Sequence, residues 1–589
     1  MTKIVRHALA IIILLCLPAA GCGPGQAGLS VKVHLPPAGK LPAGLRGEQP
    51  PGKGEFPAGI TDFRLCVSAA DMAKPRCDQF NKADYLSQGK ARLGGIPAGS
   101  NRKVTFQGYD FKETSDEKVV WCGEVSGVEI NKDATTQVEM FVTACSNFTL
   151  TRGDLERARA FHTATRLPDG RVLVTGGFNV ALGGQFCPDG DCLRLSATDS
   201  IEIYDPRQGT FSSPPGAALS VPRALHTATL LPDGRVLVAG GCQEALWYTT
   251  FNLARTPIEV ASDGWGSAGA TADIITVSGD SVSVRTVSGA MSSSRALHRA
   301  LALPDGDVLL LGGIGIGNQP LNSLTRFVTA QDTFEDQAVP LQSARQAFTM
   351  LPLEGQGEET RRLLWGGNHP AQAGAGNFAE TVSVSGDGSL ETALPAFVTG
   401  QASRGLPVFG AAGAVYDGQQ VLLTGGMLTD TSLHPNITRP EVLRLFRVID
   451  FSSGDPTITR PLDDQNTMRY FRALHTASLL QRPMDVGDPA ERILVAGGLT
   501  ASGAVGLDFE PQNTAEFFLT WESNDANSFV TSQIDSVTVQ MNEPRAGHSA
   551  SELDDGTILI VGGLTGRDPL AISNTAEIFN PRHRYLRVE

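Results

Sequence analysis

Short runs in which apolar and polar residues alternate mark the first part of the chain. Alternation with a period of two predicts strands that bury one face and expose the other. Such runs occupy 29–35, 62–67, 103–107, 119–122 and 137–143. A segment rich in proline and glycine, 36–59, separates the first two runs, and no helical period of comparable strength is present. We therefore expect residues 29–147 to form a small β-sandwich.

A different pattern repeats from residue 148 to the end of the chain. An apolar strand that ends in a glycine pair recurs seven times, at Gly176, Gly177, Gly240, Gly241, Gly312, Gly313, Gly366, Gly367, Gly425, Gly426, Gly497, Gly498, Gly562 and Gly563. Most of these strands follow an Arg-x-x-His strand and an Asp-Gly hairpin, as at 159–177, and precede a third strand such as 200–204. Seven units of three or four strands predict a seven-bladed β-propeller over 148–589, in which 148–151 completes the last blade.

The repeated Arg-x-x-His strand, Asp-Gly hairpin, Gly-Gly pair and aromatic-ended third strand resemble Kelch repeats. The resemblance covers about 152–589 and implies an all-β chain, with the sandwich followed by a Kelch-type propeller. Two departures stand out. The units are longer than the roughly 50 residues of a Kelch unit, and repeats four and five have Phe348 and Pro407 in place of the histidine.

The polar residues of the repeat are expected to be structural. A residue needed once per blade serves the blade, whereas a metal needs ligands that converge from unequal positions. This applies to His162, His226, His298, His475 and His548, so no metal site is predicted. The repeat arginines are expected to pair with Glu202, Glu380, Glu516 or Glu577; the alternative is an anion-attracting ring at the channel mouth. These arginines are Arg159, Arg223, Arg295, Arg345, Arg404, Arg472 and Arg545.

The loops between the second and third strands are unequal. From the second glycine to the acidic residue of the third strand the span is 25 residues in repeat one and 32 in repeat two, against mostly 12 to 18 elsewhere. Both insertions should rise on the propeller face where the Arg-x-x-His strands begin. The second carries Trp247, Tyr248, Phe251 and Trp265. Exposed aromatic rings there predict contact with a protein or a glycan; the alternative is that they pack the insertion against its own blade.

Charge and cysteine usage narrow the function class. Lys and Arg number 48 and Asp and Glu 62, a net charge of −14, which argues against nucleic-acid binding. Six cysteines are disulfide candidates and indicate an oxidising compartment: Cys66, Cys77, Cys122, Cys145, Cys187 and Cys192. The first four lie in the sandwich, which would be of immunoglobulin or transthyretin type, and allow three connectivities. Cys242 is left over and is expected to be a buried apolar residue.

The N-terminus predicts export. Residues 1–22 combine Lys3 and Arg6, an apolar core from Ala8 to Leu17 and small residues before Cys22, which is the pattern of a secretory signal peptide. Small residues directly followed by cysteine resemble a bacterial lipobox, although Ala19 stands where leucine is usual. The resemblance implies lipidation of Cys22, a short tether over 23–28 and a membrane-anchored protein. Gly23 favours the outer membrane of a Gram-negative cell; the alternative is ordinary signal cleavage.

One enzymatic alternative remains open. Galactose-oxidase-like copper radical enzymes also join a β-sandwich to a Kelch-type propeller, and Cys242 near Tyr248 resembles their Cys-Tyr cross-link. Their copper site includes an adjacent Tyr-His pair, and no Tyr-His dipeptide occurs in this sequence. Serine-hydrolase, zinc-protease and P-loop motifs are absent as well. We therefore expect no cofactor and a binding module anchored at the cell envelope, whose partner is a protein or a glycan.

Overall fold

The fold is known from a computed structural model. It describes residues 27–36, 60–110, 118–183, 192–248, 258–353, 359–367, 379–395, 408–416, 420–428, 441–443, 446–451, 457–458, 468–480, 491–502, 508–520, 533–566 and 571–582. The predicted signal peptide with Cys22 lies outside these ranges, as do Cys187, Phe251 and Arg404. Almost all ordered elements are strands. None of the helices in the described part of the chain has the length and apolar character needed to span a bilayer.

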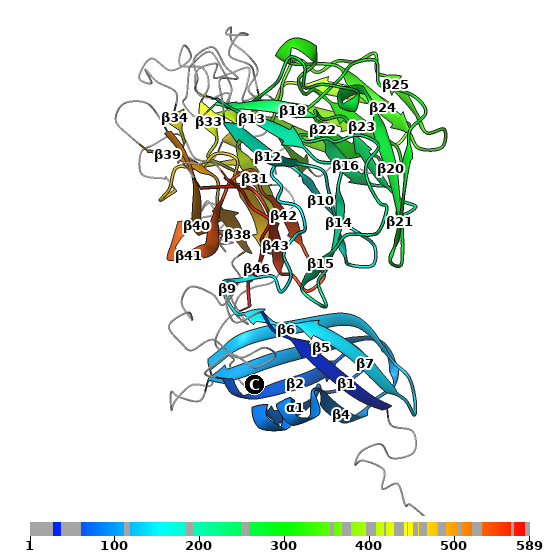
Figure 1. The fold of residues 1–589 in the computed structure, drawn as a ribbon, viewed down its shortest axis with the longest axis vertical. Helices are drawn as coiled ribbons and strands as arrows, with labels where there is room; N and C mark the ends of the chain where they lie inside the picture. Colours follow the sequence, from blue (N-terminus) through cyan, green and yellow to red (C-terminus); the bar gives the residue numbers. More distant parts are fainter. Residues whose placement is uncertain are drawn as a thin grey trace, which may run out of the picture.

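The first module is the predicted β-sandwich (Figure 1). Its two sheets have the strand orders β4-β1-β7 and β3-β2-β5-β6-β8. In the first sheet β7 is an edge strand and pairs in parallel with β1. The elements are β1 (Ala27–His34), β2 (Ile60–Ser68), β3 (Arg76–Asn81), α1 (Lys82–Gln88), β4 (Ala91–Ile96), β5 (Gly99–Asp110), β6 (Lys118–Ile130), β7 (Thr135–Phe141) and β8 (Thr143–Ala144). Leu29, Phe63, Phe106 and Trp121 fill the core between the sheets, since period-two alternation sends them to one face.

Two disulfides staple the sandwich. Cys66 is bonded to Cys77 across the β2–β3 pair, and Cys122 is bonded to Cys145. Of the three possible connectivities, the chain therefore uses the one that joins neighbours in sequence. Outside the sandwich Cys192 is disulfide-bonded as well. Disulfides of this kind are typical of exported proteins.

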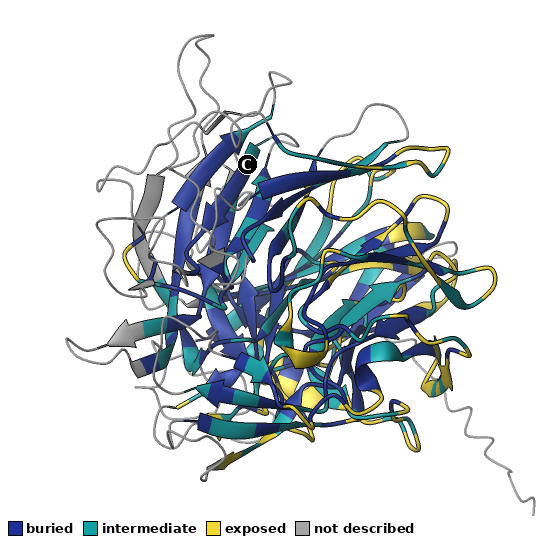
Figure 2. Ribbon diagram, turned by 90° about the horizontal axis from the view of Figure 1, so that it is seen from above, coloured by how far each residue is buried: buried dark blue, intermediate teal, exposed yellow. Residues whose placement is uncertain are grey.

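The second module is a propeller of seven blades, counted over the described residues. Four antiparallel strands build a typical blade, and the innermost strand comes first in the chain. The first three blades are β10 (Thr163–Arg166), β11 (Val172–Thr175), β14 (Ile201–Asp205), β15 (Thr210–Ser212); β16 (Thr227–Leu230), β17 (Val236–Ala239), β20 (Ala272–Ser278), β21 (Ser281–Thr286); and β22 (Arg299–Ala302), β23 (Val308–Leu311), β24 (Leu324–Val328), β25 (Thr333–Asp336). Figure 2 shows the buried residues concentrated in the strands and many of the exposed ones in the connecting loops.

The remaining blades complete the ring. They are β26 (Thr349–Leu353), β27 (Thr360–Trp365), β28 (Ala379–Val384), β29 (Leu390–Ala393); β31 (Ala412–Tyr416), β32 (Gln420–Thr424), β35 (Phe446–Asp450), β36 (Thr457–Ile458); β37 (Thr476–Leu480), β38 (Glu491–Ala496), β40 (Asp508–Thr520), β41 (Gln533–Arg545); and β42 (Ser549–Glu552), β43 (Ile558–Val561), β46 (Ala576–Asn580), β9 (Asn147–Leu150). The outer strand of the last blade, β9, comes from the start of the module and pairs with β46. The predicted closure of the ring is confirmed.

The glycine pairs have a common physical reason. All fourteen glycines adopt a positive φ, which residues with a Cβ rarely do. A Cβ on Gly240 would also lie 2.6 Å from the carbonyl oxygen of Arg295 and 2.7 Å from Cε1 of His298, both in the next blade. The pair therefore lets the Arg-x-x-His segment of one blade approach the backbone of the blade before it.

Each described repeat arginine is buried and ties its own blade together. The Nη1 of Arg345, for example, donates to the carbonyl of Gly366 at 2.8 Å, and its Nε donates to Glu380 at 2.8 Å. The four expected carboxylates take part: Glu202, Glu380, Glu516 and Glu577 each pair with the arginine of their blade. Two blades differ. Asp273 pairs with Arg223, whereas Arg295 reaches the hydroxyl of Thr325. Since these guanidinium groups are buried, they form no anion-attracting surface.

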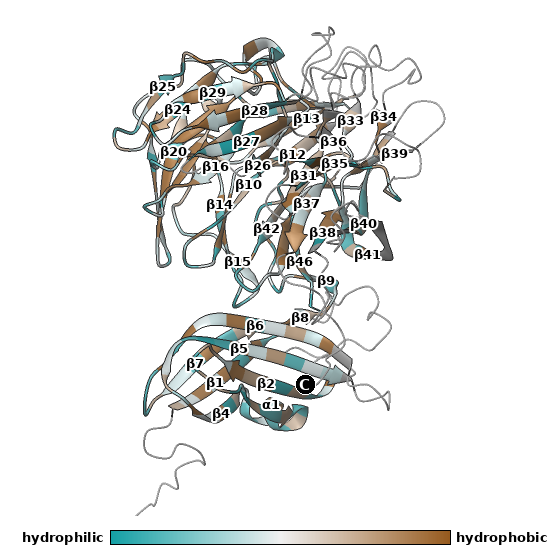
Figure 3. Ribbon diagram, turned by 180° about the vertical axis from the view of Figure 1, so that it is seen from behind, coloured by the Kyte–Doolittle hydropathy of each residue, from teal (hydrophilic) through white to brown (hydrophobic). Residues whose placement is uncertain are grey.

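The two modules contact each other directly, with the outer ends of the propeller hairpins next to the sandwich, as Figure 3 shows from behind. Arg582 pairs with Glu124 at 3.2 Å, and the amide of Asn580 donates to Thr143 at 2.8 Å. Arg152 donates to Nδ1 of His34 at 3.0 Å. Because β1 ends at His34, its first residue lies about 23 Å further from this contact, at 3.3 Å per residue.

Candidate functional site

The two long insertions join into one β-sheet on the propeller. Strands β12 (Phe178–Gly183) and β13 (Cys192–Ala197) come from the first blade, and β18 (Glu244–Tyr248) and β19 (Ile258–Val260) from the second. They form a four-stranded sheet in the order β12-β13-β18-β19, here called the insertion sheet. Figure 1 shows β13 and β18 on the side of the propeller away from the sandwich. Two further small sheets are present. One consists of β30 (Val408–Phe409), β33 (Met427–Leu428) and β34 (Glu441–Val442), and the other of β44 (Leu564–Thr565) and β45 (Ala571–Ile572). Strand β39 (Leu499–Ser502) pairs with the first residues of β40.

The inner face of the insertion sheet covers the propeller axis. Strand register places Leu193, Trp247 and Ile258 in one row across β13, β18 and β19. The ring of Trp247 lies 6.1 Å from that of Phe161, which belongs to the first blade. All of these side chains belong to, or pack against, one apolar cluster that draws residues from most of the blades. The insertion sheet is therefore an apolar cover over one end of the propeller channel.

Beneath the cover lies an axial cavity of about 210 Å³. Its wall includes Ile258 of the insertion sheet and the residue before each repeat histidine. Those residues are linked by a chain of backbone hydrogen bonds around the axis, in which Leu225 donates to Phe161, Leu297 to Leu225 and Ala347 to Leu297. Their backbones have positive φ, so the chain turns at the axis before it enters the innermost strand.

The repeat histidines line the same cavity and bridge adjacent blades. Each Nε2 is hydrogen-bonded to a hydroxyl of the preceding blade, His226 to Thr163 at 3.0 Å and His548 to Thr476 at 3.0 Å, for example. Burial, together with the positive charge of the neighbouring arginines, lowers the pKa of His226 and His548 to about 3. The imidazoles are therefore neutral at pH 7. In the described part of the chain no group of three or more His, Cys, Asp or Glu side chains converges to hold a metal ion.

The predicted aromatic contact residues need correction. Trp247 is 2% exposed and Trp265 is 6% exposed, so the expectation of exposed indole rings is wrong for both. Period-two alternation explains the outcome for Trp247, because Ala245 and Trp247 both face the blades from β18. Trp265 lies outside the strands and packs into the same apolar cluster. Tyr248 points to the opposite face and donates from its hydroxyl to Glu259 at 3.1 Å. Phe251 lies outside the described residues.

The outer face of the insertion sheet exposes apolar side chains that sequence reasoning missed. Val180 is 40% exposed and Leu182 is 48% exposed, both on the edge strand β12. Leu182, Arg194 and Leu246 form one row across three strands. Arg194 pairs with Glu244 and, at 2.8 Å, with Asp263, and this pairing lowers the pKa of Asp263. The sequence Phe178-Asn-Val-Ala-Leu-Gly183 carries no signal of this exposure, because period-two alternation with Asn179 on the solvent side would predict that Val180 and Leu182 are buried.

The residues present do not fit a copper radical site. Cys242 is fully buried, and burial raises the pKa of its thiol. Its backbone N–H donates to the carbonyl of Ala224, next to the blade, whereas Tyr248 ends β18. Cys242 belongs to the apolar cluster on the inner side of the insertion sheet, whereas Tyr248 points to the outer face and its hydroxyl donates to Glu259. The two side chains lie on opposite sides of the sheet, an arrangement that does not allow a Cys-Tyr cross-link, and the insertion sheet covers the axis from that side.

Comparisons with known proteins find likeness in architecture alone. No model of a protein family matches the chain, and no curated protein matches it in sequence. Among solved structures, a fungal alcohol oxidase of the AA5 family, determined in complex with copper, is similar with a TM-score of 0.44 and 16% identity, covering 73% of this chain and 75% of that one. The protein YjhT is similar with a TM-score of 0.36 and 11% identity, covering 64% of this chain and 98% of that one.

Proposed function

We propose that this chain is an exported, lipid-anchored propeller that binds a partner protein at the cell envelope through the outer face of the insertion sheet. The observation that carries the proposal is the pair of exposed apolar side chains, Val180 and Leu182, on the edge strand of a sheet that covers the propeller axis. Exposed apolar residues that sit together on an edge strand mark interaction surfaces.

The side chains of this face favour a protein over a glycan. Sugars stack on exposed aromatic rings. The two indoles of the second insertion are buried beneath the sheet instead. A face that combines apolar residues with ion pairs, such as Arg194 with Asp263, has the composition of a protein interface.

The direction of β1 supports the proposed anchor. The strand runs toward the propeller, so Ala27 lies at the far end of the sandwich, and Cys22 precedes Ala27 by five residues. A lipid on Cys22 would therefore put the sandwich next to the membrane and the insertion sheet on the distal side (Figure 1). The sandwich would act as a spacer.

Cross-linking on intact cells tests the proposal. A photoreactive residue at position 246, in the row of Leu182, should capture a partner protein. Leu182→Glu should reduce the captured partner at least tenfold, whereas Leu86→Glu should not, because Leu86 is 42% exposed on α1 of the sandwich and matches Leu182 in type and exposure. Equal capture by the two variants would refute the assignment to the insertion sheet. Cys22→Ala should release the protein from the membrane fraction.

A further inference from the structure

A second surface, in the sandwich, has the features of a peptide-binding groove. We propose that the seam between β6 and β7 binds an extended peptide segment of another protein, in which a basic side chain stands next to an apolar one. The seam lies beside the sandwich, at the opposite end of the propeller from the insertion sheet, so this inference goes beyond the proposed function. The seam has unpaired strand edges, apolar side chains and acidic residues.

The seam is a place where consecutive strands do not pair. β6 and β7 are joined by only four residues, 131–134, yet β6 pairs with β5 in one sheet and β7 pairs with β1 in the other. The far edge of β6 pairs with β8 only at Trp121 and Cys122. Within the described residues, Gly123–Ile130 of β6 and the whole outer edge of β7 therefore have no strand partner. A cavity of about 400 Å³ lies there, lined by both strands.

Backbone groups of β7 point into this cavity. The backbone N–H of Gly28 donates to the carbonyl of Ala134, and the N–H of Val142 donates to the carbonyl of His34. The even-numbered residues of β7 therefore direct their N–H and C=O groups toward β1. Successive residues of a strand direct these groups to opposite sides. Gln137 and Glu139 must then direct their N–H and C=O groups into the seam. An extended peptide would satisfy them as an added strand, a common mode of peptide recognition.

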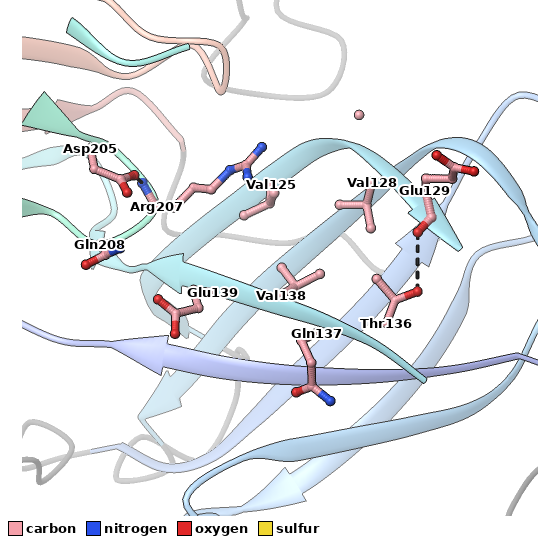
Figure 4. A pocket seen from close by; sticks show the side chains of 11 residues that line it. Val125, Val128, Glu129, Thr136, Gln137, Val138, Glu139, Asp205, Arg207 and Gln208 are labelled. Atoms are coloured by element: carbon pink, nitrogen blue, oxygen red, sulfur yellow. Dashed lines mark hydrogen bonds between the residues drawn. The ribbon is translucent and has the colours of Figure 1, made fainter. Parts of the chain in front are cut away.

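The side chains around the seam indicate the chemistry of the peptide. Figure 4 shows Val125, Val128 and Val138 between the two strands, where they form an apolar floor. The charged residues that line the same cavity are Glu129, Glu139, Asp205 and Arg207, three carboxylates against one guanidinium. Glu139 already pairs with Lys32 at 3.0 Å, so Glu129 and Asp205 offer the negative charge. An apolar side chain fits the floor and a neighbouring Lys or Arg fits the acidic rim.

The propeller supplies one wall of the groove. Asp205, Arg207 and Gln208 belong to the β14–β15 hairpin of the first blade and line the cavity together with the sandwich residues. This hairpin is tied down by its Gly209, whose carbonyl accepts hydrogen bonds from the backbone N–H groups of Arg152 and Gly153 and whose backbone lies close to the ring of Phe141. At the other end Thr136 donates to the carbonyl of Glu129 at 3.3 Å and bridges the two strands (Figure 4). The groove therefore has fixed walls before any peptide binds.

A matched pair of variants at Gln137 tests the strand-addition geometry. Gln137→Pro removes the N–H that faces the seam and leaves the β1–β7 hydrogen bonds intact, and proline is tolerated on an edge strand. Gln137→Ala keeps that N–H and removes only the side chain. The protein without residues 1–21, both modules included, is used to select binders from a displayed library of random ten-residue peptides. One enriched peptide then serves as the probe in binding titrations.

The expected result is enrichment of peptides in which Lys or Arg alternates with Val, Ile or Leu. Gln137→Pro should bind the probe at least tenfold more weakly than Gln137→Ala, with the melting temperature of both variants as the check on folding. Glu129→Gln should weaken binding about threefold and make it less dependent on salt. Equal affinities for the two Gln137 variants would overturn the proposal, as would a library that yields no peptide or yields peptides without basic residues.

Discussion

The buried histidines between the blades should make the propeller sensitive to acid. His226 and His548 have a pKa of about 3 in the folded chain because burial disfavours their charged form, against 6.5 when they are exposed. A group whose pKa is lowered by folding contributes stability above its unfolded pKa and loses that contribution as the pH falls toward the folded value. The affected window therefore runs from about pH 6.5 down to about pH 3.

The magnitude follows from the unfolded chain. Between pH 7 and pH 4.5 the unfolded histidine takes up nearly one proton and the folded one takes up almost none. The free energy of unfolding then falls by about 2.5 kcal/mol for each such residue. The figure depends little on the folded pKa, provided that this stays below about 4. Burial also places the pKa of His162, His298 and His475 well below 6.5, so several blade interfaces weaken together.

The variant His548→Gln isolates one of these contributions. It should lower the free energy of unfolding at pH 7 by about 1 to 2 kcal/mol, since a buried hydrogen bond to Thr476 is disturbed. From pH 7 to pH 4.5, however, its stability should fall by about 2.5 kcal/mol less than that of the wild type. Urea titrations at pH 7, 6, 5 and 4.5, followed by tryptophan fluorescence, measure both quantities.

Thr476→Val is the control, because it removes the same hydrogen bond and keeps the imidazole. It should be destabilised at every pH by a constant amount and should keep the slope of the wild type. Parallel stability curves for the wild type and His548→Gln would refute the reasoning, since His548 would then not be a neutral buried group.

Two further predictions concern the joints of the propeller. Gly240→Ala should destabilise the protein by at least about 2 kcal/mol, because the added Cβ meets the backbone of the next blade. Gly279→Ala is the control: Gly279 has a similar φ and no neighbour within 4 Å, so this variant should cost only about 1 kcal/mol. Thermal unfolding compares the two variants, and equal losses of stability would contradict the close-approach argument. Glu380→Gln should lower the free energy of unfolding by about 3 kcal/mol, because it leaves Arg345 buried without its anion. The control Glu391→Gln, at an exposed position, should change the free energy of unfolding by less than about 0.5 kcal/mol. Chemical denaturation measures both changes, and equal losses would contradict the buried-pair argument.

Much of the propeller could be predicted because its repeat residues act locally and identically. The Gly-Gly pair makes the same joint in every blade, and a buried arginine pairs with a third-strand acid in five of the described blades, so these residues recur in the sequence. Departures are harder to interpret. In the fifth blade Arg447 occupies the acid's place on the third strand and lies 5.6 Å from the ring centre of Trp365 in the fourth blade. That contact joins residues 82 positions apart, and no repeat pattern signals it.

The candidate site was harder to predict because it depends on strand register between two insertions. Aromatic residues in a long loop indicate a contact surface only if they face solvent, and the pairing of β13 with β18 turns Trp247 inward. The disulfides illustrate the same limit: Cys66 faces Cys77 because β2 and β3 pair in that register, which spacing alone does not give. Local patterns thus predict strands, whereas the pairing partner decides which face each side chain takes.

The insertion sheet also explains why the fold alone does not determine the function. A propeller offers its axis as a ligand site only when one end of the channel is open. Here Trp247 and Ile258 belong to an apolar cluster that covers that end, and the axial cavity of about 210 Å³ lies beneath them. A substrate that entered from this end would have to displace the cluster, at about 25 cal/mol for each Å² of apolar surface exposed. Recognition is therefore expected on the outer surfaces, where Leu182 is exposed and where the seam of the sandwich is open.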